Sequence, residues 1–210
     1  MNIADYIDHT LLKSDATKED IIKLCKEAEE YKLKGVCINS SYVQLASKLL
    51  DKSILVSVVG FPLGANITLV KALESEMAVK NGAREIDMVM NIGFFKSQDY
   101  KKVLDDMKEV VKASSPYPVK VIVETCLLNE EEKIKVCHLV LDSGASFIKT
   151  STGFSFKGAD IQDIKLFKSI VKDDLKIKAS GGIRTKEDAI KMIEAGADRI
   201  GASASLKIIS

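Results

Sequence analysis

The feature of this sequence that most constrains its fold is the repeated alternation of short β-branched runs with helix-like segments. Three helix-to-strand junctions carry the same glycine-alanine step, at Asn81-Gly82-Ala83, Ser143-Gly144-Ala145 and Ala195-Gly196-Ala197. Glycine ends a helix in the left-handed conformation, and the small alanine allows a tight turn into the next strand. Eight strands alternating with helices predict an α/β fold, a (β/α)8 TIM barrel, formed as a single domain over residues 1–210.

The expected strands are rich in β-branched and apolar residues and lie at positions 6–10, 35–39, 54–60, 85–91, 119–125, 146–153, 176–182 and 199–203, the sixth and seventh ending in glycine turns. The expected helices lie at about 17–32, 42–50, 68–78, 98–112, from 129 onward, 161–172 and 185–195. Residues 17–20 resemble a capping box, and Thr68 is expected to cap its helix. An open doubly wound sheet is the alternative, but neither the G-x-G-x-x-G nor the G-x-x-x-x-G-K-[ST] motif occurs.

The charge balance argues against a nucleic-acid-binding protein. Lysine plus arginine (31) nearly cancels aspartate plus glutamate (30), so an anion must be bound by local groups. No run approaches the roughly 18 apolar residues of a membrane span, and the N-terminus lacks the regions of a signal peptide. We therefore expect a cytoplasmic protein without a membrane or nucleic-acid partner.

The four cysteines, Cys25, Cys37, Cys126 and Cys137, form no C-x-x-C pair, and reduced thiols are expected. His9 and His138 are the only histidines, and their spacing from the cysteines matches no zinc motif. No structural metal is predicted. His9 is expected to be a hydrogen-bonded structural residue, and neither histidine is given a catalytic role.

Two strands carry a lysine at matching positions. On a strand alternate side chains share a face, so Lys149 projects with Phe147 and Ser151. Lys178 stands at about the same distance from the start of the next strand, and neighbouring strands lie roughly 4.8 Å apart. If this face lines a barrel, two amines are brought close together. The alternative is that both lysines lie on the rim with their amines in water.

Such a pair suits amine chemistry on a carbonyl. A lysine is a nucleophile only when neutral, so its pKa must fall from about 10.4 to about 7 or 8. A second ammonium about 5.5 Å away contributes about 3 kcal/mol, or about two pKa units, at an effective dielectric near 20. Partial burial can supply the remainder, which leaves one neutral lysine for covalent catalysis.

Active sites of such barrels lie at the carboxyl ends of the strands, where Asp8, Cys37, Asp87 and Glu124 are also expected. Asp87 shares a face with Val89 and Asn91, which favours a polar pocket in which it relays protons. Its alternative role is a structural partner of Lys178. Cys37 can line the pocket but has no histidine partner that would make it a nucleophile.

The last three expected strands each end near a glycine, in Ser151-Thr152-Gly153, Ser180-Gly181-Gly182 and Gly201-Ala202-Ser203. Backbone N–H groups at such turns can surround a phosphate near the loops after strands seven and eight. Residues 205–209 are expected to form a short helix whose N-terminus faces that anion.

Five motifs in order resemble the deoxyribose-phosphate aldolase family: Ile7-Asp8-His9-Thr10-Leu11, Gly60-Phe61-Pro62-Leu63-Gly64, Glu85-Ile86-Asp87-Met88-Val89-Met90-Asn91, Phe147-Ile148-Lys149-Thr150-Ser151-Thr152-Gly153 and Lys178-Ala179-Ser180-Gly181-Gly182-Ile183-Arg184. The resemblance implies a class I aldolase without metal or other cofactor. Its reaction would cleave 2-deoxy-D-ribose 5-phosphate reversibly to D-glyceraldehyde 3-phosphate and acetaldehyde. A homodimer is also implied.

In this resemblance Lys149 matches the lysine that forms the Schiff base, Lys178 the lysine that perturbs its pKa, and Asp87 the acid that shuttles protons. Asp8 and Cys37 match pocket neighbours. The matched phosphate contacts are Gly153, Gly181, Gly182 and Ser203.

Two departures accompany the resemblance. Ala204 replaces a second serine that many members carry, which removes one phosphate hydrogen bond, and Ser210 ends the sequence without the tyrosine-ended tail of some members. Two other functions stay open on the residues alone: a metal-free phosphosugar isomerase or epimerase with Asp87 or Glu124 as base, and a noncatalytic phosphosugar sensor.

Overall fold

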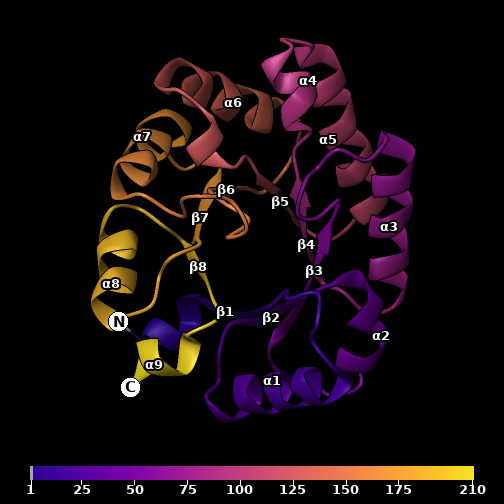
Figure 1. The fold of residues 1–210 in the computed structure, drawn as a ribbon, viewed down its shortest axis with the longest axis vertical. Helices are drawn as coiled ribbons and strands as arrows, with labels where there is room; N and C mark the ends of the chain where they lie inside the picture. The colour runs from indigo at the N-terminus through magenta and orange to yellow at the C-terminus, as the bar shows by residue number, and fades with distance from the viewer. Residues whose placement is uncertain (1) are drawn as a thin grey trace.

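A computed structural model describes residues 2–210 (Figure 1). Eight parallel strands form a closed barrel in the order β1 to β8, and β8 pairs with β1 to close it. This confirms the expected (β/α)8 class. The strands are β1 Ile7–Leu11, β2 Gly35–Ile38, β3 Ile54–Val59, β4 Glu85–Val89, β5 Val119–Ile122, β6 Phe147–Lys149, β7 Lys176–Ser180 and β8 Arg199–Ala202.

The helices surround the barrel as an outer layer (Figure 1). The α-helices are α1 Lys18–Glu30, α2 Val43–Ala46, α3 Thr68–Lys80, α4 Ile92–Lys96, α5 Tyr100–Ser114, α6 Glu130–Asp142, α7 Ile161–Val171, α8 Lys186–Glu194 and α9 Ser205–Ile209. Short 3-10 helices are η1 Ile3–Tyr6, η2 Ser40–Tyr42 and η3 Thr125–Leu127. The short helix expected at 205–209 is therefore present.

Local capping explains where several helices begin. The side chains of Thr17, Asn129 and Thr185 each accept a hydrogen bond from the backbone three residues on, in complete capping boxes at α1, α6 and α8. The expectation for α3 was wrong. Ile67 is the N-cap, and the Thr68 hydroxyl instead donates to Asp106 Oδ1 at 2.9 Å.

Two helical segments differ from the expectation. The helix expected at 42–50 is only one turn of 3-10 helix followed by α2. The residues before the expected helix at 98–112 form α4, because the Asn91 side chain caps it by accepting from the Phe94 N–H. Gln98, at a φ of 58°, separates α4 from α5.

The molecule has an apolar layer and a charged centre. Buried side chains such as Ile21, Met107 and Phe167 fill the space between the barrel and the helices. Inside the barrel, by contrast, lie seven buried charged residues, namely Asp8, Glu85, Asp87, Lys120, Lys149, Lys178 and Arg199. Buried charges are stable only when paired, so this centre must be organised by ion pairs.

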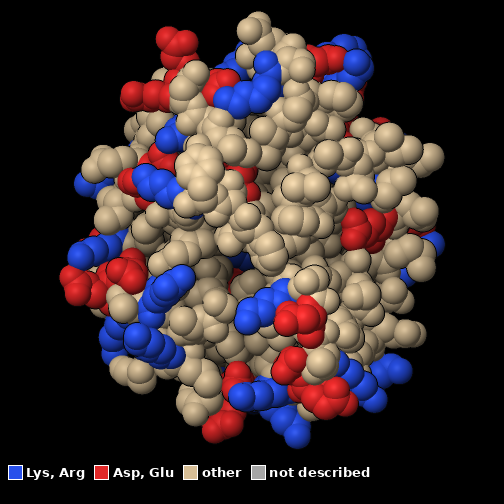
Figure 2. Space-filling model, in the orientation of Figure 1, with Lys and Arg blue, Asp and Glu red and all other residues tan. Residues whose placement is uncertain are grey.

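Helix α3 exposes an apolar face. Leu69, Leu73 and Met77 are 73%, 54% and 46% exposed, whereas Lys71 and Ser75 are buried. Figure 2 shows mainly uncharged atoms over this side of the molecule and both signs of charge interspersed elsewhere. No helix within residues 2–210 combines the length and apolar character that crossing a bilayer requires.

Candidate active site

Strand register places the two expected lysines side by side. Lys149 on β6 is the register partner of Lys178 on β7, and both side chains are buried inside the barrel. Both Nζ atoms donate to the same oxygen, Asp87 Oδ2, at 2.8 Å each. The two nitrogens therefore lie within twice that distance of each other. The alternative in which both amines lie in water on the rim was wrong.

Two glycines make room for this arrangement. A Cβ atom on Gly201 would lie 3.1 Å from Lys178 Cε, and one on Gly35 would lie 2.8 Å from Asp8 Oδ1. Both contacts are closer than ordinary van der Waals packing allows. The missing side chains on β2 and β8 let Asp8 and Lys178 fold into the barrel interior.

Asp8 and Asp87 are the acidic residues that contact the two lysines. Lys178 Nζ lies 2.5 Å from Asp8 Oδ2, and Arg199 Nη1 lies 2.7 Å from Asp8 Oδ1. The other carboxylate oxygen of Asp87, Oδ1, accepts from Lys120 Nζ at 2.8 Å. Asp87 therefore contacts three lysines at once, which exceeds the single pairing with Lys178 considered from the sequence.

The local charges set the protonation states. Burial alone would raise the pKa of Asp8, but Lys178 and Arg199 outweigh it and hold that pKa at about 2. Burial also opposes the ionised form of Asp87, and the three lysines around it keep its pKa well below the usual value. For Lys178, burial is outweighed by Asp8 and Asp87, which raise the pKa. At neutral pH Lys178 is thus protonated and Asp87 is ionised.

A cavity of about 380 Å³ opens above Lys149 at the carboxyl ends of the strands. All four residues expected to bind phosphate line it, namely Gly153, Gly181, Gly182 and Ser203. Asp8, Cys37, Asp87 and Lys178 are not part of its wall and lie deeper in the barrel. Lys149 is therefore the interior amine that a molecule in the cavity meets.

The model of the DeoC/LacD family aldolases matches residues 3–210 of this sequence. The chain belongs to this aldolase family. A curated deoxyribose-phosphate aldolase from Staphylococcus carnosus is 55% identical over 211 residues, which cover 100% of this chain and 96% of the relative. The family resemblance found in the motifs is thus confirmed over the whole chain.

Solved structures agree with this membership. The aldolase QR15 superposes with a TM-score of 0.98 at 44% identity and covers 100% of this chain and 95% of its own. The deoxyribose phosphate aldolase from Aeropyrum pernix, described as a unique tetramer, superposes with a TM-score of 0.91 at 36% identity. It covers 99% of this chain and 89% of its own length.

Three charged residues in the interior of this aldolase were missed from the sequence. Lys120 on β5 contacts Glu85 Oε2 at 2.5 Å as well as Asp87, and Arg199 on β8 contacts Glu85 Oε2 at 3.1 Å. One signal was available for Glu85, since it stands two residues before Asp87 on β4 and so shares its face. For Lys120 and Arg199, the sequence does not show which face of the strand points into the barrel. Only the closed barrel shows that both side chains point inward.

Cys37 faces the acid of the cluster. Its Sγ lies 3.9 Å from Asp87 Oδ2, and burial raises the pKa of the Cys37 thiol to about 11. A thiol with this pKa is neutral at physiological pH and is a poor nucleophile. Cys37 therefore fills space beside the lysines of the aldolase.

Glu124 serves a different part of the site. It has a φ of 54°, and its carboxylate accepts from both the backbone N–H and the hydroxyl of Thr152. Burial raises the pKa of Glu124, although these two hydrogen bonds oppose the shift. The contact fixes the turn that leads into Gly153, whose φ is 83°.

His9 points away from the cavity of the aldolase and has two partners. Its Nδ1 lies 2.9 Å from Ser205 Oγ, and its Nε2 lies 2.9 Å from Glu27 Oε2. These contacts tie β1 to α9 and α1, as expected for a structural histidine. His138 is exposed on α6. Among residues 2–210, no group of three or more histidine, cysteine or acidic side chains is arranged to hold a metal ion.

Proposed function

We propose that this aldolase cleaves 2-deoxy-D-ribose 5-phosphate reversibly to D-glyceraldehyde 3-phosphate and acetaldehyde through a Schiff base on Lys149. The observation that carries the proposal is the shared oxygen: Lys149 Nζ and Lys178 Nζ both contact Asp87 Oδ2 below a glycine-lined cavity. The names of the curated relatives support the substrate. The position of Lys149 in the cavity wall supports its role as the nucleophile.

The chemistry begins at the aldehyde carbon, C1, of the open-chain sugar. The neutral amine of Lys149 attacks C1, and loss of water gives an iminium ion. The hydroxyl on C3 then loses its proton, and the C2–C3 bond breaks with its electron pair moving toward the iminium nitrogen. Glyceraldehyde 3-phosphate leaves, and C2 of the remaining enamine takes up a proton. Addition of water to the second iminium releases acetaldehyde and restores the amine.

Lys178 and Asp87 support these steps in different ways. The raised pKa of Lys178 keeps a positive charge beside Lys149, so a further proton on Lys149 is disfavoured by repulsion. Asp87 is an ionised acceptor within hydrogen-bond distance of Lys149, and it is placed to take the proton that this amine loses. We assign Asp87 to proton transfer through water between the amine and the reacting sugar.

The phosphate of the substrate is assigned to the outer part of the cavity. Gly153, Gly181 and Gly182 present backbone there and Ser203 a hydroxyl, whereas Ala204 offers none. A Cβ atom on Gly181 would lie 2.9 Å from Gly158 Cα, so only glycine fits this turn. Two exposed cations, Lys13 and Arg184, also line the cavity and add local positive charge for an anion. Asp8 and Cys37 are proposed as neighbours beneath the bound sugar.

Borohydride trapping tests the proposal. Reduction in the presence of acetaldehyde should add a two-carbon unit to Lys149, located by peptide mass spectrometry, and should inactivate the enzyme. Lys149→Met should lose both trapping and turnover, whereas Lys176→Met, which changes an exposed lysine near the start of β7, should retain both. Turnover by Lys149→Met would contradict the Schiff base. Product formation without trapping would indicate an isomerase, and phosphosugar binding without turnover would indicate a sensor.

We also propose a cytoplasmic homodimer. The exposed Leu69, Leu73 and Met77 on α3 form an apolar face of the kind that subunits bury against each other. The four free cysteines suit a reducing compartment. Sedimentation velocity tests the assembly: a dimer that dissociates in Leu73→Glu supports the proposal, and a monomer or an unaffected dimer contradicts it.

A further inference from the structure

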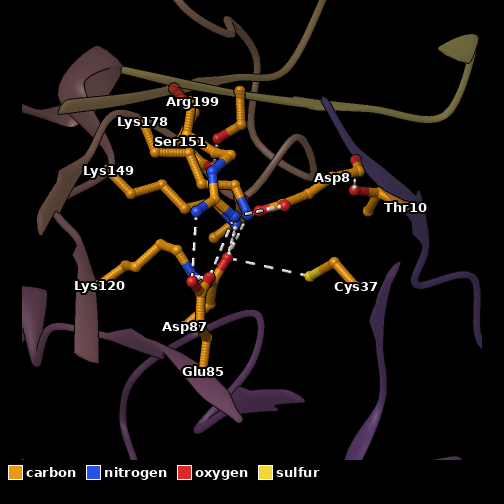
Figure 3. A network of polar contacts seen from close by, with 12 residues as sticks. Asp8, Thr10, Cys37, Glu85, Asp87, Lys120, Lys149, Ser151, Lys178 and Arg199 are labelled. Carbon is orange, nitrogen blue, oxygen red and sulfur yellow. Dashed lines mark hydrogen bonds and ion pairs between the residues drawn. The ribbon is translucent and has the colours of Figure 1, made fainter. Parts of the chain in front are cut away.

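Six buried side chains inside the barrel form a closed ring in which acids and bases alternate (Figure 3). We call it the charge ring; its members in order are Asp8, Arg199, Glu85, Lys120, Asp87 and Lys178, which contacts Asp8 again. The shortest distance between the charged atoms of successive members lies between 2.5 and 3.1 Å. Within the ring, each member therefore has two partners of opposite charge.

Lys149 lies outside this ring. Its one acidic partner within ion-pair distance, among residues 2–210, is Asp87 Oδ2 at 2.8 Å, and that oxygen already accepts from Lys178 at the same distance. The charge ring contains three carboxylates and three cations, so it is neutral without Lys149. A protonated Lys149 gives the barrel interior one unmatched positive charge.

We propose that the charge ring selects Lys149 as the interior amine that gives up its proton, and that Glu85, Lys120 and Arg199 are positioning residues that act through their charge. This inference rests on the proposed function, in which Lys149 must be neutral. Two adjacent ammonium groups disfavour each other equally, and only their acidic partners decide which one keeps its proton.

The physical reason is the high energy of unpaired charge in a buried site. Lys178 has two carboxylate partners, Asp8 at 2.5 Å and Asp87 at 2.8 Å, and losing its proton would leave Asp8 with one cation fewer. Lys149, by contrast, has one acidic contact, to Asp87 Oδ2, and Lys178 contacts the same oxygen. Loss of one proton from any of the four cations would make the interior neutral, but only loss from Lys149 leaves every ion pair of the charge ring in place.

Other titratable groups near Lys149 form no ion pair with it among the described residues. Cys37 is neutral at physiological pH because burial raises its thiol pKa to about 11. Glu124 is held by hydrogen bonds from Thr152, and burial raises its pKa while the charge of Lys149 opposes that shift, so Glu124 is an outer carboxyl group that acts on Lys149 from a distance. Lys13 and Arg184 are exposed at the cavity mouth, where solvent screens their charge.

The test is the pH profile of imine formation with acetaldehyde, followed by borohydride trapping, in Glu85→Gln, Arg199→Gln and the double variant. Removing the acid leaves excess positive charge, so the midpoint should move to lower pH. Removing the base leaves excess negative charge, so the midpoint should move to higher pH. A unit charge about 10 Å away, at an effective dielectric near 20, gives shifts on the order of one pH unit.

The double variant separates charge from mere structure. It removes one acid and one base together and restores neutrality, so its midpoint should return close to that of the wild type. Two single shifts in the same direction, or a double variant displaced further than both, would overturn the proposal. Asp106→Asn is the matched control, because it removes a buried carboxylate paired with Lys71 outside the barrel. It should lower stability and leave the midpoint unchanged.

If the variants do not fold, a measurement on the wild-type protein tests the proposal instead. With 13C-labelled lysine at neutral pH, the Cε signal of Lys149 should have the chemical shift of a neutral amine, while those of Lys120 and Lys178 should have the shift of an ammonium group. A neutral Lys120 or Lys178 beside a charged Lys149 would overturn the proposal. This readout does not depend on turnover. An enzyme that folds but is never trapped by borohydride would instead contradict the proposed function.

Discussion

Lys149 and Lys178 are register partners on adjacent strands, so a single pair of hydrogen-bonded strands brings the two amines together. Their environments nevertheless differ. Lys178 is fully buried with two carboxylates, whereas Lys149 lines the cavity with one shared carboxylate. The same register thus produces a fixed cation and an accessible amine, which is the asymmetry that a Schiff-base enzyme needs.

Replacing Lys178 by leucine should slow imine formation at neutral pH and move its pH midpoint upward. The variant removes the cation beside Lys149, and the effect expected from a charge about 5.5 Å away is about two pH units. Stopped-flow or trapping rates across a pH series measure the shift. Lys176→Leu, on the same strand but exposed, should retain the wild-type profile. An unchanged profile in Lys178→Leu would rule out the electrostatic role.

Replacing Glu124 by glutamine should weaken binding of the phosphorylated sugar more than that of unphosphorylated deoxyribose. The Glu124 carboxylate accepts both hydrogen bonds from Thr152, and the amide cannot accept both equally well. The turn before Gly153 would then be less fixed. We expect KM for the phosphorylated sugar to rise several-fold, on the scale of one lost hydrogen bond of about 1 kcal/mol. Equal effects on both substrates would contradict this role.

Placing a Cβ atom at Gly201 should disturb the position of Lys178. The added atom would lie 3.1 Å from Lys178 Cε and 3.0 Å from Ser180 Cβ, so one of the two must move. Gly201→Ala should lower the free energy of unfolding by about 1–3 kcal/mol and reduce kcat. Gly93→Ala in α4 is the control, because its nearest contact would be 3.5 Å from Asn91 Oδ1. Full activity and stability in both variants would contradict the packing argument.

Acid should destabilise the protein through Asp8 and Asp87. The pKa of Asp8 is lowered from 3.8 to about 2 in the folded state, mainly because Lys178 and Arg199 outweigh the opposing effect of burial. A carboxylate with a lowered folded-state pKa stabilises the fold above its unfolded pKa and loses that contribution as the pH falls. Asp8 alone should contribute roughly 2 kcal/mol at neutral pH, lost between pH ~4 and ~2.

Urea denaturation at a series of pH values measures this dependence. The pKa of Asp87 is also lowered, so it adds to the loss in the same direction. Asp8→Asn should be less stable at neutral pH and show a shallower acid dependence than the wild type. Equal slopes for the two proteins would show that Asp8 does not contribute through its ionised form.

The chain order of the elements was predictable because local interactions set it. Capping residues such as Thr17 and Thr185 start their helices, and glycines such as Gly82 and Gly196 at positive φ end helices before a strand. The expected helix caps were wrong where contacts between residues distant in the sequence compete with local capping preferences. Thr68 does not cap α3 because its hydroxyl bonds to Asp106 on α5, and residues distant in sequence decide that choice.

The sequence by itself determined the alternation of strands and helices, the pair Lys149 and Lys178, and Asp87 as their acidic neighbour, because period, spacing and motif are properties of short segments. Only the tertiary structure decided that Lys120, Glu85 and Arg199 join Asp8 in one ring. Their contacts join β1, β4, β5 and β8, and these strands meet only when the barrel closes. Ion pairs across a closed barrel depend on the register of its strands and on its curvature, and no single segment of the sequence determines either of them.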